Sequence, residues 1–409
     1  MPNSSLSSSG LGAYNKVIEL TGDIMTELIK QISGREVVAT DLTHRHLLVV
    51  GQTGSGKTTT TLALLSQLQR ANQTAIIFDP TGEYAKLPNA TTNRLGGNAY
   101  LHAGSLSADQ LLMVLGLAGD GWLKEKVSTA ITALRIQQNV LASTGVYQKR
   151  DRQTREFESQ VAKLDDWTSG YDITCLADQL VEETVRPYTD ERANYRMLGQ
   201  VYDRSVINSH WDQLVTLRER LNNKGMRQLF GTVKTPGVVN TELNFVLKMF
   251  LAQPSNHKTL VLDLSALKSF GAGQQMVISV LLRRLLEDRL AKPGHFPVSI
   301  VIDEAHRYLP SKDEDLAANG IFQILREGRK VNLAMVLTTQ SPLDLPAKLR
   351  SQFAGALIHR LTTPEEWAAL GLTPLDVQLD TGQVLVIQDG QEVTSGRVNL
   401  PDWWEGGQL

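Results

Sequence analysis

Residues 51–58 read GQTGSGKT, and this stretch fits the pattern G-x-x-x-x-G-K-[ST] at every fixed position. An apolar run, residues 47–50, precedes it, and a helical pattern starts at Lys57. The pattern identifies a phosphate-binding loop when a strand comes before it and a helix follows. The sequence therefore predicts a strand, an anion-binding loop and a helix, around which the rest of an α/β fold is organised.

Each type of residue in this loop has a separate physical role. Gly51, Gly54 and Gly56 allow positive φ and a close approach of backbone N–H groups to an anion. The loop opens onto a helix N-terminus, which favours negative charge. Lys57 is placed to reach the β- and γ-phosphates, and the Thr58 hydroxyl to bind Mg²⁺. The expected ATP-binding residues are Gly51, Gln52, Thr53, Gly54, Ser55, Gly56, Lys57, Thr58 and Thr59.

The composition is that of an ordinary globular protein. The 409 residues are 42% hydrophobic and 21% charged, and the formal net charge is −2, which excludes a uniformly basic, DNA-coating surface. The single cysteine, Cys175, excludes an intramolecular disulfide and fits a reducing compartment. No run reaches the ~18 apolar residues of a membrane span, and no signal peptide is recognisable. We therefore expect a soluble, cytoplasmic protein without membrane contact.

Short apolar runs alternate with helical patterns along the chain. Strands are expected at residues 47–50, 75–78, 259–264, 298–304 and 333–338. Such alternation predicts a doubly wound, parallel sheet. Residues 91–254 show mainly helical periodicity. We expect an ATPase core formed by residues 44–90 and 255–400, a helical insertion at 91–254, an N-terminal arm at 1–43 and a C-terminal tail at 401–409.

Four smaller segments carry weaker signals. Apolar spacing predicts a helix within residues 14–32, and Asp389-Gly390 predicts a hairpin turn. Trp403 and Trp404 are expected to anchor the tail by packing, with base stacking as the alternative. Residues 148–160 mix basic with acidic side chains, so a solvated helical face is favoured over a DNA-contacting one.

Three of the expected strands end in or near an aspartate. Only Asp303 is followed directly by a second carboxylate, Glu304. We expect Asp303 to hold the metal through water and Glu304 to polarise the attacking water. Asp79 and Asp263 are interpreted as capping residues, because Asp is favoured at such positions. Glu83 is a weaker candidate for the nucleotide site.

Two further features fit a hydrolysis site. Gln340 closes an apolar strand, where its amide could sense the γ-phosphate, or could merely tie down the next loop. Arg326 and Arg329 lie three residues apart on one expected helix face. An arginine acting on a neighbouring subunit would stabilise transition-state charge. The alternative is a surface ion pair with Glu327 or Asp315.

Five motifs occur in order along the chain: GQTGSGKT, DPTGEY from Asp79, VIDEAH from Val301, REGRK from Arg326 and TTQSP from Thr338. In this order the chain resembles the HerA branch of the HerA/FtsK ATPases. The resemblance implies a RecA-like P-loop core, ATP and Mg²⁺ as cofactors, and hexameric rings that move double-stranded DNA through a central pore. It also implies a nuclease or other effector partner, in DNA processing or anti-phage defence.

The resemblance assigns the site residues as well. It implies nucleotide and Mg²⁺ roles for Lys57 and Thr58, metal and water roles for Asp303 and Glu304, a sensor role for Gln340, and action in trans for Arg329 and, secondarily, Arg326. HerA-like proteins usually begin with a β-barrel domain, and residues 1–43 are too few to form one.

Two other functions stay open. Asp303 to His306 spells DEAH, as in DEAH-box helicases, but too few residues follow to hold a second motor lobe. A nucleotide-gated scaffold would assemble an effector on DNA without net translocation. The sequence does not identify the partner, the polarity of movement, the pore-lining residues or the ring size.

Overall fold

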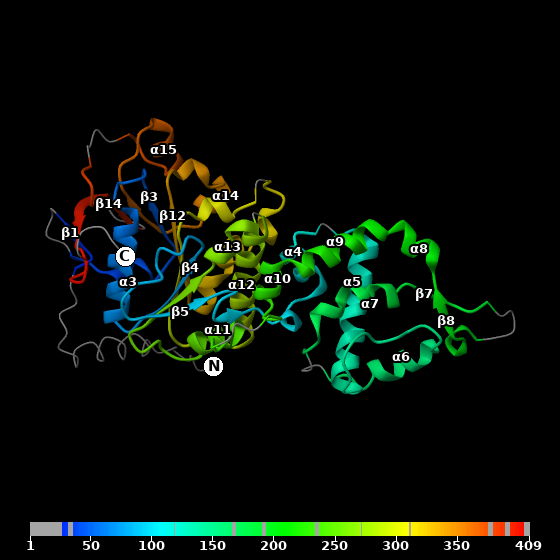
Figure 1. Cartoon of the computed structure of the whole chain (residues 1–409). Coiled ribbons are helices and arrows are strands. Elements are labelled where there is room, and N and C mark those ends of the chain that lie inside the picture. Colours follow the sequence, from blue (N-terminus) through cyan, green and yellow to red (C-terminus); the bar gives the residue numbers. More distant parts are fainter. Residues whose placement is uncertain are drawn as a thin grey trace, which may run out of the picture.

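The computed structural model describes residues 27–31, 36–117, 119–165, 169–189, 194–233, 237–270, 272–310, 312–374, 379–388 and 393–404. Within these residues the largest sheet has 11 strands, in the order β2-β1-β15-β14-β13-β3-β12-β11-β4-β10-β5, and it lies in the part of the molecule opposite α6 (Thr154–Val161) and α8 (Arg204–Ser209) (Figure 1). Its strands are β1 (Ile29–Gln31), β2 (Glu36–Val37), β3 (Leu47–Val50), β4 (Thr74–Asp79), β5 (Ala90–Arg94), β10 (Thr259–Asp263), β11 (Val298–Ile302), β12 (Leu333–Thr339), β13 (Gly355–Ile358), β14 (Gln383–Gln388) and β15 (Thr394–Val398).

The sheet has a parallel part and an antiparallel part. From β5 across to β13 every neighbouring pair is parallel, whereas β13 to β14, β14 to β15, β15 to β1 and β1 to β2 are antiparallel. The five strands expected from the sequence are confirmed as β3, β4, β10, β11 and β12. Because parallel strands end at one edge, the loops after β3, β4, β11 and β12 meet there.

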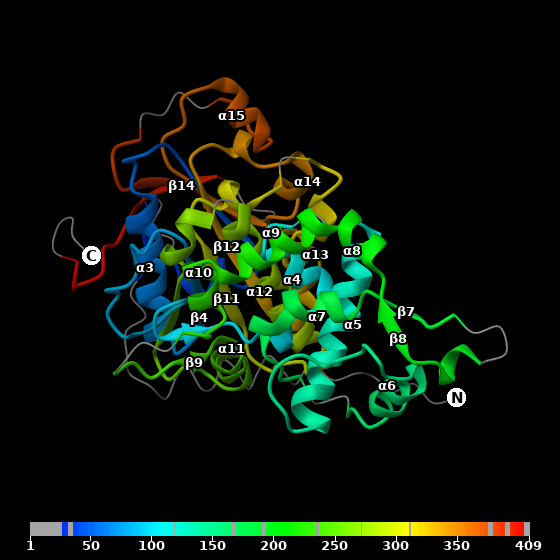
Figure 2. The same ribbon diagram turned by 45° about the vertical axis from the view of Figure 1, so that its right-hand side comes forward.

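Alternate residues of each central strand enter two separate cores. In β3, Leu47 and Val49 pack with the leucines of α3 (Lys57–Arg70), while Leu48 and Val50 face the core that holds α12 (Ala272–Ala291) and α13 (Gly320–Glu327). Strand residues alternate in direction, so both faces must be covered when both are apolar. Helices therefore lie on both sides of the sheet (Figure 2), as expected for the doubly wound, RecA-like α/β fold.

The remaining α-helices belong mostly to the segment between β5 and β10. They are α2 (Ala39–Leu42), α4 (Ala108–Val114), α5 (Gly121–Arg135), α6 (Thr154–Val161), α7 (Leu176–Glu182), α8 (Arg204–Ser209), α9 (Trp211–Asn222), α10 (Lys224–Leu229), α11 (Leu243–Ala252), α14 (Ala347–Arg350) and α15 (Pro364–Ala369). No helix within the described residues is long and apolar enough to span a membrane.

The domain boundaries expected from the sequence are corrected at two places. Strand β5 pairs in parallel with β10, so the core sheet continues past residue 90. Strands β1 and β2 lie within the expected N-terminal arm, yet they extend the same sheet. The helix expected to reach Ile32 is also wrong at Ile29–Gln31, because Ile29 pairs with Val398 of β15 and is fully buried. The rest of that expected helix lies outside the described residues.

The inserted segment, residues 95–258, is mainly helical and adds two small sheets. Strand β6 (Ala99–Tyr100) pairs with β9 (Thr241–Glu242), and β7 (Val185–Pro187) pairs with β8 (Gln200–Tyr202). Side chains of α4 and α11 share the core cluster of α12, so the segment packs on the ATPase core. The β7–β8 hairpin projects away from the central sheet (Figures 1 and 2).

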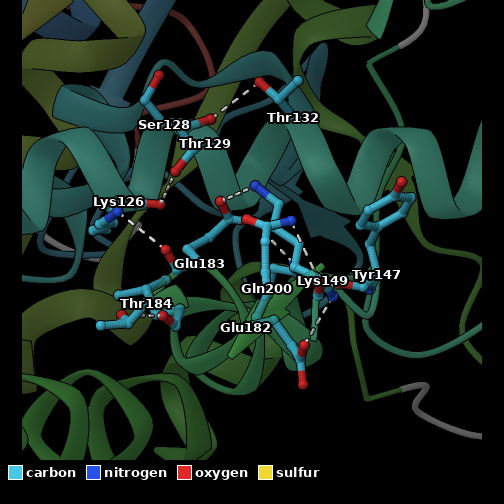
Figure 3. A network of polar contacts seen from close by, with 12 residues as sticks. Lys126, Ser128, Thr129, Thr132, Tyr147, Lys149, Glu182, Glu183, Thr184 and Gln200 are labelled. Carbon is cyan, nitrogen blue, oxygen red and sulfur yellow. Dashed lines mark hydrogen bonds and ion pairs between the residues drawn. The ribbon is translucent and has the colours of Figure 1, made fainter. Parts of the chain in front are cut away.

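A buried polar network fixes the basic stretch that follows α5 (Figure 3). The ammonium of Lys149 pairs with the Glu183 carboxylate, and the two side chains are only 10% and 2% exposed. The Lys149 backbone N–H donates to Glu182 Oε2 at 2.9 Å, and Gln179 Nε2 donates to Glu183 Oε1 at 3.0 Å. The solvated-face interpretation is therefore wrong for Lys149, although no residue of α6 is buried.

The C-terminal part supports the packing interpretation of the tryptophans. Strands β14 and β15 form the expected antiparallel pair, while Asp389 and Gly390 lie outside the described residues. Trp403 and Trp404 are half-buried against the α3 side of the sheet and contact each other edge-on, with ring centroids 6.4 Å apart. Residues 405–409 of the expected tail are likewise outside the described residues.

Candidate functional site

The phosphate-binding loop connects β3 to α3 as the sequence predicts. Gly51, Gly54 and Gly56 have φ values of 154°, 77° and 110°, and Gly56 caps the helix that begins at Lys57. Positive φ is costly for any residue with a Cβ. At Gly51 a Cβ would also lie 2.5 Å from the Cβ of His359. The loop conformation therefore requires glycine at its first position.

Lys57 folds over the loop that it follows. Its Nζ donates to the carbonyl of Gly51 at 2.6 Å and to that of Gln52 at 3.2 Å. Burial lowers the pKa of Lys57, while the nearby Glu304 and Asp303 carboxylates oppose that shift. The ammonium thus lies between the loop and the acidic end of β11, where an anion bound by the loop would meet it.

Asp303 is held rigidly at the end of β11. The side chain is 6% exposed and accepts hydrogen bonds from the Thr338 hydroxyl, from the Glu304 backbone N–H at 3.0 Å and from the Tyr84 hydroxyl at 2.9 Å. These donors come from β12, from the chain after β11 and from the turn after β4. The sequence did not single out Tyr84 or Thr338, although both stand inside the quoted motifs.

Glu304 follows in the left-handed conformation, with φ 50° and ψ 47°. Its backbone N–H also donates to Thr338 Oγ1 at 2.9 Å, and Gln340 Nε2 donates to its Oε1 at 3.1 Å. Among the described residues, the buried Oε2 atom has no hydrogen-bond partner, although His306 Nδ1 approaches it to 3.3 Å. One carboxylate oxygen is therefore tied by Gln340, and the other can accept a proton.

The oxygen donors at this edge suit a magnesium ion. Mg²⁺ prefers hard oxygen ligands and keeps several waters, so it needs only one or two protein groups. Thr58, in the first turn of α3, and Asp303 supply a hydroxyl and a carboxylate of the required kind. The unpartnered Glu304 Oε2 is consistent with a site that takes up water. The donor set therefore fits the expected ion.

Arg326 and Arg329 lie near the amino ends of the parallel strands, whereas the phosphate loop lies at their carboxyl ends. Arg326 lies in the last turn of α13, and Arg329 belongs to the short turn at Gly328–Val331 that precedes the amino end of β12. Arg329 is close enough to His46, which precedes β3, to help burial lower its pKa to about 4. A seven-residue strand spans roughly 20 Å. Neither arginine can reach the phosphate loop of its own chain.

The family model described as "Helicase HerA, central domain" matches residues 36–285, which is more than half of the chain. The chain belongs to the HerA helicase family. It is 23% identical over 329 residues to "DNA double-strand break repair helicase HerA" of Sulfurisphaera tokodaii, with 79% of this chain and 56% of that protein covered. It is also 23% identical over 342 residues to a "Probable DNA double-strand break repair helicase HerA" of Methanocaldococcus jannaschii, with 80% and 63% covered.

The HerA-family chain thus spans about three fifths of the length of these relatives. Among solved structures it is similar to VirB4 of Thermoanaerobacter pseudethanolicus, at a TM-score of 0.59 and 13% identity, covering 92% of this chain and 96% of that one. It is also similar to the bacterial conjugative coupling protein TrwB, at 0.55 and 15%, covering 95% and 93%. At these identities the likeness shows the fold alone, and it agrees with the RecA-like α/β core.

The other aspartates have structural roles in this HerA-family chain. Asp79 accepts four hydrogen bonds at Oδ1, from the Thr81 N–H and hydroxyl and from the Gly82 and Glu83 N–H groups, and a fifth from the Tyr84 N–H. Burial raises its pKa despite these donors. Asp263 accepts from the Ser265 N–H and lies 3.5 Å from Arg94 Nε. Both aspartates end strands and bond the chain that follows, but Asp79 caps a turn and not a helix, because no helix follows β4 directly; Glu83 is exposed.

His359 is the main residue of the HerA-family site that the sequence did not reveal. It is fully buried after β13, donates its backbone N–H to Val50 at 2.8 Å, and places its Nε2 3.0 Å from Thr60 Oγ1. Burial, reinforced by Lys57, lowers its pKa to about 4. The chain after β13 also contacts the phosphate loop at Gln52, whose Nε2 donates to the Thr362 hydroxyl at 2.9 Å.

Proposed function

We propose that the protein is an ATP-hydrolysing, ring-forming DNA translocase in which two neighbouring chains build each hydrolysis centre. Lys57, Asp303 and Glu304 supply a phosphate-binding cation, a metal-holding carboxylate and a water-polarising carboxylate. The observation that carries the proposal is the buried Oε2 of Glu304, which has no hydrogen-bond partner in the described part of the chain. A carboxylate oxygen that accepts no hydrogen bond from the protein can accept one from water, as a general base requires.

Each residue around the ATP phosphates would have a separate role in hydrolysis. The loop N–H groups and Lys57 bind and orient the β- and γ-phosphates. Thr58 and Asp303 would hold Mg²⁺, which supplies charge neutralisation at the phosphates when bound. Glu304 accepts a proton from the attacking water through Oε2. Gln340 holds Oε1 and is the group that would exchange this contact for one to the γ-phosphate.

The missing component is a cation for the transition state. In the described part of the chain, no arginine side chain hydrogen bonds or ion pairs with Lys57, Asp303 or Glu304. Arg329 and Arg326 are exposed near the amino ends of the parallel strands, away from the phosphate loop. Neither forms an ion pair with any described carboxylate. An arginine supplied by a neighbour contributes about 10³–10⁵ in rate, or about 4–7 kcal/mol. This supports a ring in which Arg329 acts on the next subunit.

The finer parts of the proposal follow from the HerA family. The relatives are named as DNA double-strand break repair helicases, which supports DNA as the substrate. A hexamer with double-stranded DNA in its central pore is the form of ring that we propose. A nuclease or other effector as partner, and a role in DNA processing or anti-phage defence, belong to the same proposal.

The test is DNA-dependent ATP hydrolysis by the full chain. We expect turnover that duplex DNA stimulates, that Lys57→Ala and Glu304→Gln abolish, and that the exposed control Glu287→Gln leaves unchanged. Native mass measurement with ATP and DNA should give a ring. Turnover that survives both changes would refute the assignment, and DNA binding without directional movement in single-molecule tracking would identify a scaffold instead of a motor.

A further inference from the structure

A polar cavity of about 390 Å³ lies beside the hydrolysis site, on the other side of β11 from the phosphate loop. Three loops at the carboxyl edge of the sheet form it: the turn after β4, the chain after β10 with the start of α12, and the turn after β11. Its lining residues are Pro80, Thr81, Lys268, Gln274, Gln275, Arg307 and Tyr308.

The lining has the chemistry of an anion site. Its lining residues include two cations, Lys268 and Arg307, and no carboxylate. Gln275 stands in the first turn of α12, a 20-residue helix whose amino end favours negative charge. Arg307 is exposed and free of any ion pair to a described residue. It is therefore the cation left to meet an anion in this cavity.

A second observation also points to a ligand. Tyr308 is only 4% exposed and lines the cavity, yet no described residue hydrogen bonds to its hydroxyl. The hydroxyl oxygen itself is not enclosed by protein, so it is available to hydrogen bond with a ligand or with water in the cavity. Lys268 is partly committed, since its Nζ donates to the Thr81 carbonyl at 2.8 Å and faces Glu83.

The geometry points to this cavity as a binding site for a phosphodiester group of the nucleic-acid backbone. The cavity is distinct from the phosphate loop, because the loop follows β3 whereas the cavity extends from the end of β11 to the ends of β4 and β10 in the sheet. An arginine, an amide and a phenol together suit a phosphate oxygen, which accepts hydrogen bonds only. The assignment rests on the proposed DNA translocase.

Residues on two sides of the cavity are connected, through the backbone and hydrogen bonds, to the catalytic groups Glu304 and Asp303. Arg307 and Tyr308 belong to the single turn that begins at Glu304, and the Arg307 N–H donates to the Glu304 carbonyl at 3.0 Å. On the other wall, Thr81 belongs to the turn capped by Asp79, which continues to Tyr84 and its hydrogen bond to Asp303. A phosphate bound at Arg307 would therefore affect the position of Glu304 through the turn after β11. It would affect the position of Asp303 through the turn after β4.

The experiment measures duplex binding by the full chain as a function of salt concentration. It compares the wild type with Arg307→Gln and Tyr308→Phe. The control is Arg397→Gln in β15, which β14, β13, β3, β12 and β11 separate from β4 in the sheet. Each phosphate contact contributes about 0.9 to the slope of log affinity against log salt. We expect Arg307→Gln to weaken binding about tenfold, to lower the slope by about one, and to reduce the DNA stimulation of ATP turnover. Tyr308→Phe should weaken binding less, and Arg397→Gln should match the wild type.

The outcomes separate this inference from the proposed function. A wild type that neither binds duplex nor responds to it would overturn both. Wild-type binding with an unchanged slope in Arg307→Gln would overturn the cavity assignment alone. Inorganic phosphate is titrated in parallel: phosphate binding that Arg307→Gln abolishes, together with an unchanged duplex slope, would identify a small-anion site and overturn the phosphodiester assignment.

Discussion

The hydroxyl of Tyr84 donates a 2.9 Å hydrogen bond to Oδ2 of Asp303, and Tyr84 is fully buried. This contact joins the turn after β4 to the carboxylate that would hold the metal. It keeps Asp303 oriented without neutralising it, because the phenol donates a hydrogen bond, keeps its proton and carries no charge.

Replacing Tyr84 by Phe should weaken the response to magnesium. A hydrogen bond to a charged group contributes about 1.5–3 kcal/mol, so we expect the half-saturating Mg²⁺ concentration for ATP turnover to rise about tenfold. The matched control is Tyr202→Phe, which removes a tyrosine hydroxyl bonded to Glu182 in the inserted segment. An unchanged magnesium response in Tyr84→Phe would separate Asp303 from the metal.

The phosphate loop should not tolerate a side chain at Gly51. Gly51→Ala would place a Cβ 2.5 Å from the Cβ of His359, whereas at Gly54 nothing lies within 4 Å of the added atom. Both alanines would have positive φ, which costs about 1 kcal/mol. We expect Gly51→Ala to abolish measurable nucleotide binding and Gly54→Ala to weaken it modestly, as followed by nucleotide titration. Equal effects would show that His359 does not press on the loop.

Stability should fall when the pH drops below about 6.5. Burial holds the pKa of both His46 and His359 at about 4, below the ordinary value of 6.5. The unfolded chain therefore binds more protons, and stability rises with pH between about 4 and 6.5. Each histidine accounts for about 3 kcal/mol of that change. Denaturant unfolding at a series of pH values should show a smaller change in His359→Gln, and an identical profile in that variant would contradict the assignment.

The buried pair in the inserted segment should behave as a unit. Lys149→Met leaves Glu183 buried without its cation, which we expect to cost about 3–5 kcal/mol of unfolding free energy. The double variant Lys149→Met, Glu183→Gln should recover part of this loss, because both charges of the pair are then removed. Urea unfolding of the two variants measures the difference. The exposed pair of Arg218 and Asp178 is the control, and its removal should cost less than about 1 kcal/mol.

The sequence predicts the parts of the site that lie in continuous motifs. Residues 51–58 form the phosphate loop, and Asp303, Glu304 and Gln340 meet at one sheet edge, because parallel strands carry their carboxyl ends there. Local patterns also predict the five central strands and the helix at Ala272–Ala291. The roles assigned to these residues stay predictions.

Other parts depend on contacts between distant residues. His359 supports the loop from a position about 300 residues away, after the four-residue strand β13, which has no distinctive pattern. Strand β1 forms only because β15 offers it an edge, so its helical spacing misleads. The burial of Lys149 likewise depends on Glu182, the last residue of α7, and on Glu183, which follows that helix. No local periodicity carries such information.

The central claim is that Arg329 of one chain completes the site that contains Glu304 of its neighbour. The most direct test co-expresses Arg329→Ala and Glu304→Gln subunits with different tags and isolates rings that contain both. Each variant alone should lack DNA-stimulated ATP turnover, and the mixed rings should regain a clear fraction of it, because some interfaces then pair an intact Glu304 with an intact Arg329. Mixed rings that stay inactive, or full turnover by Arg329→Ala alone, would contradict the account.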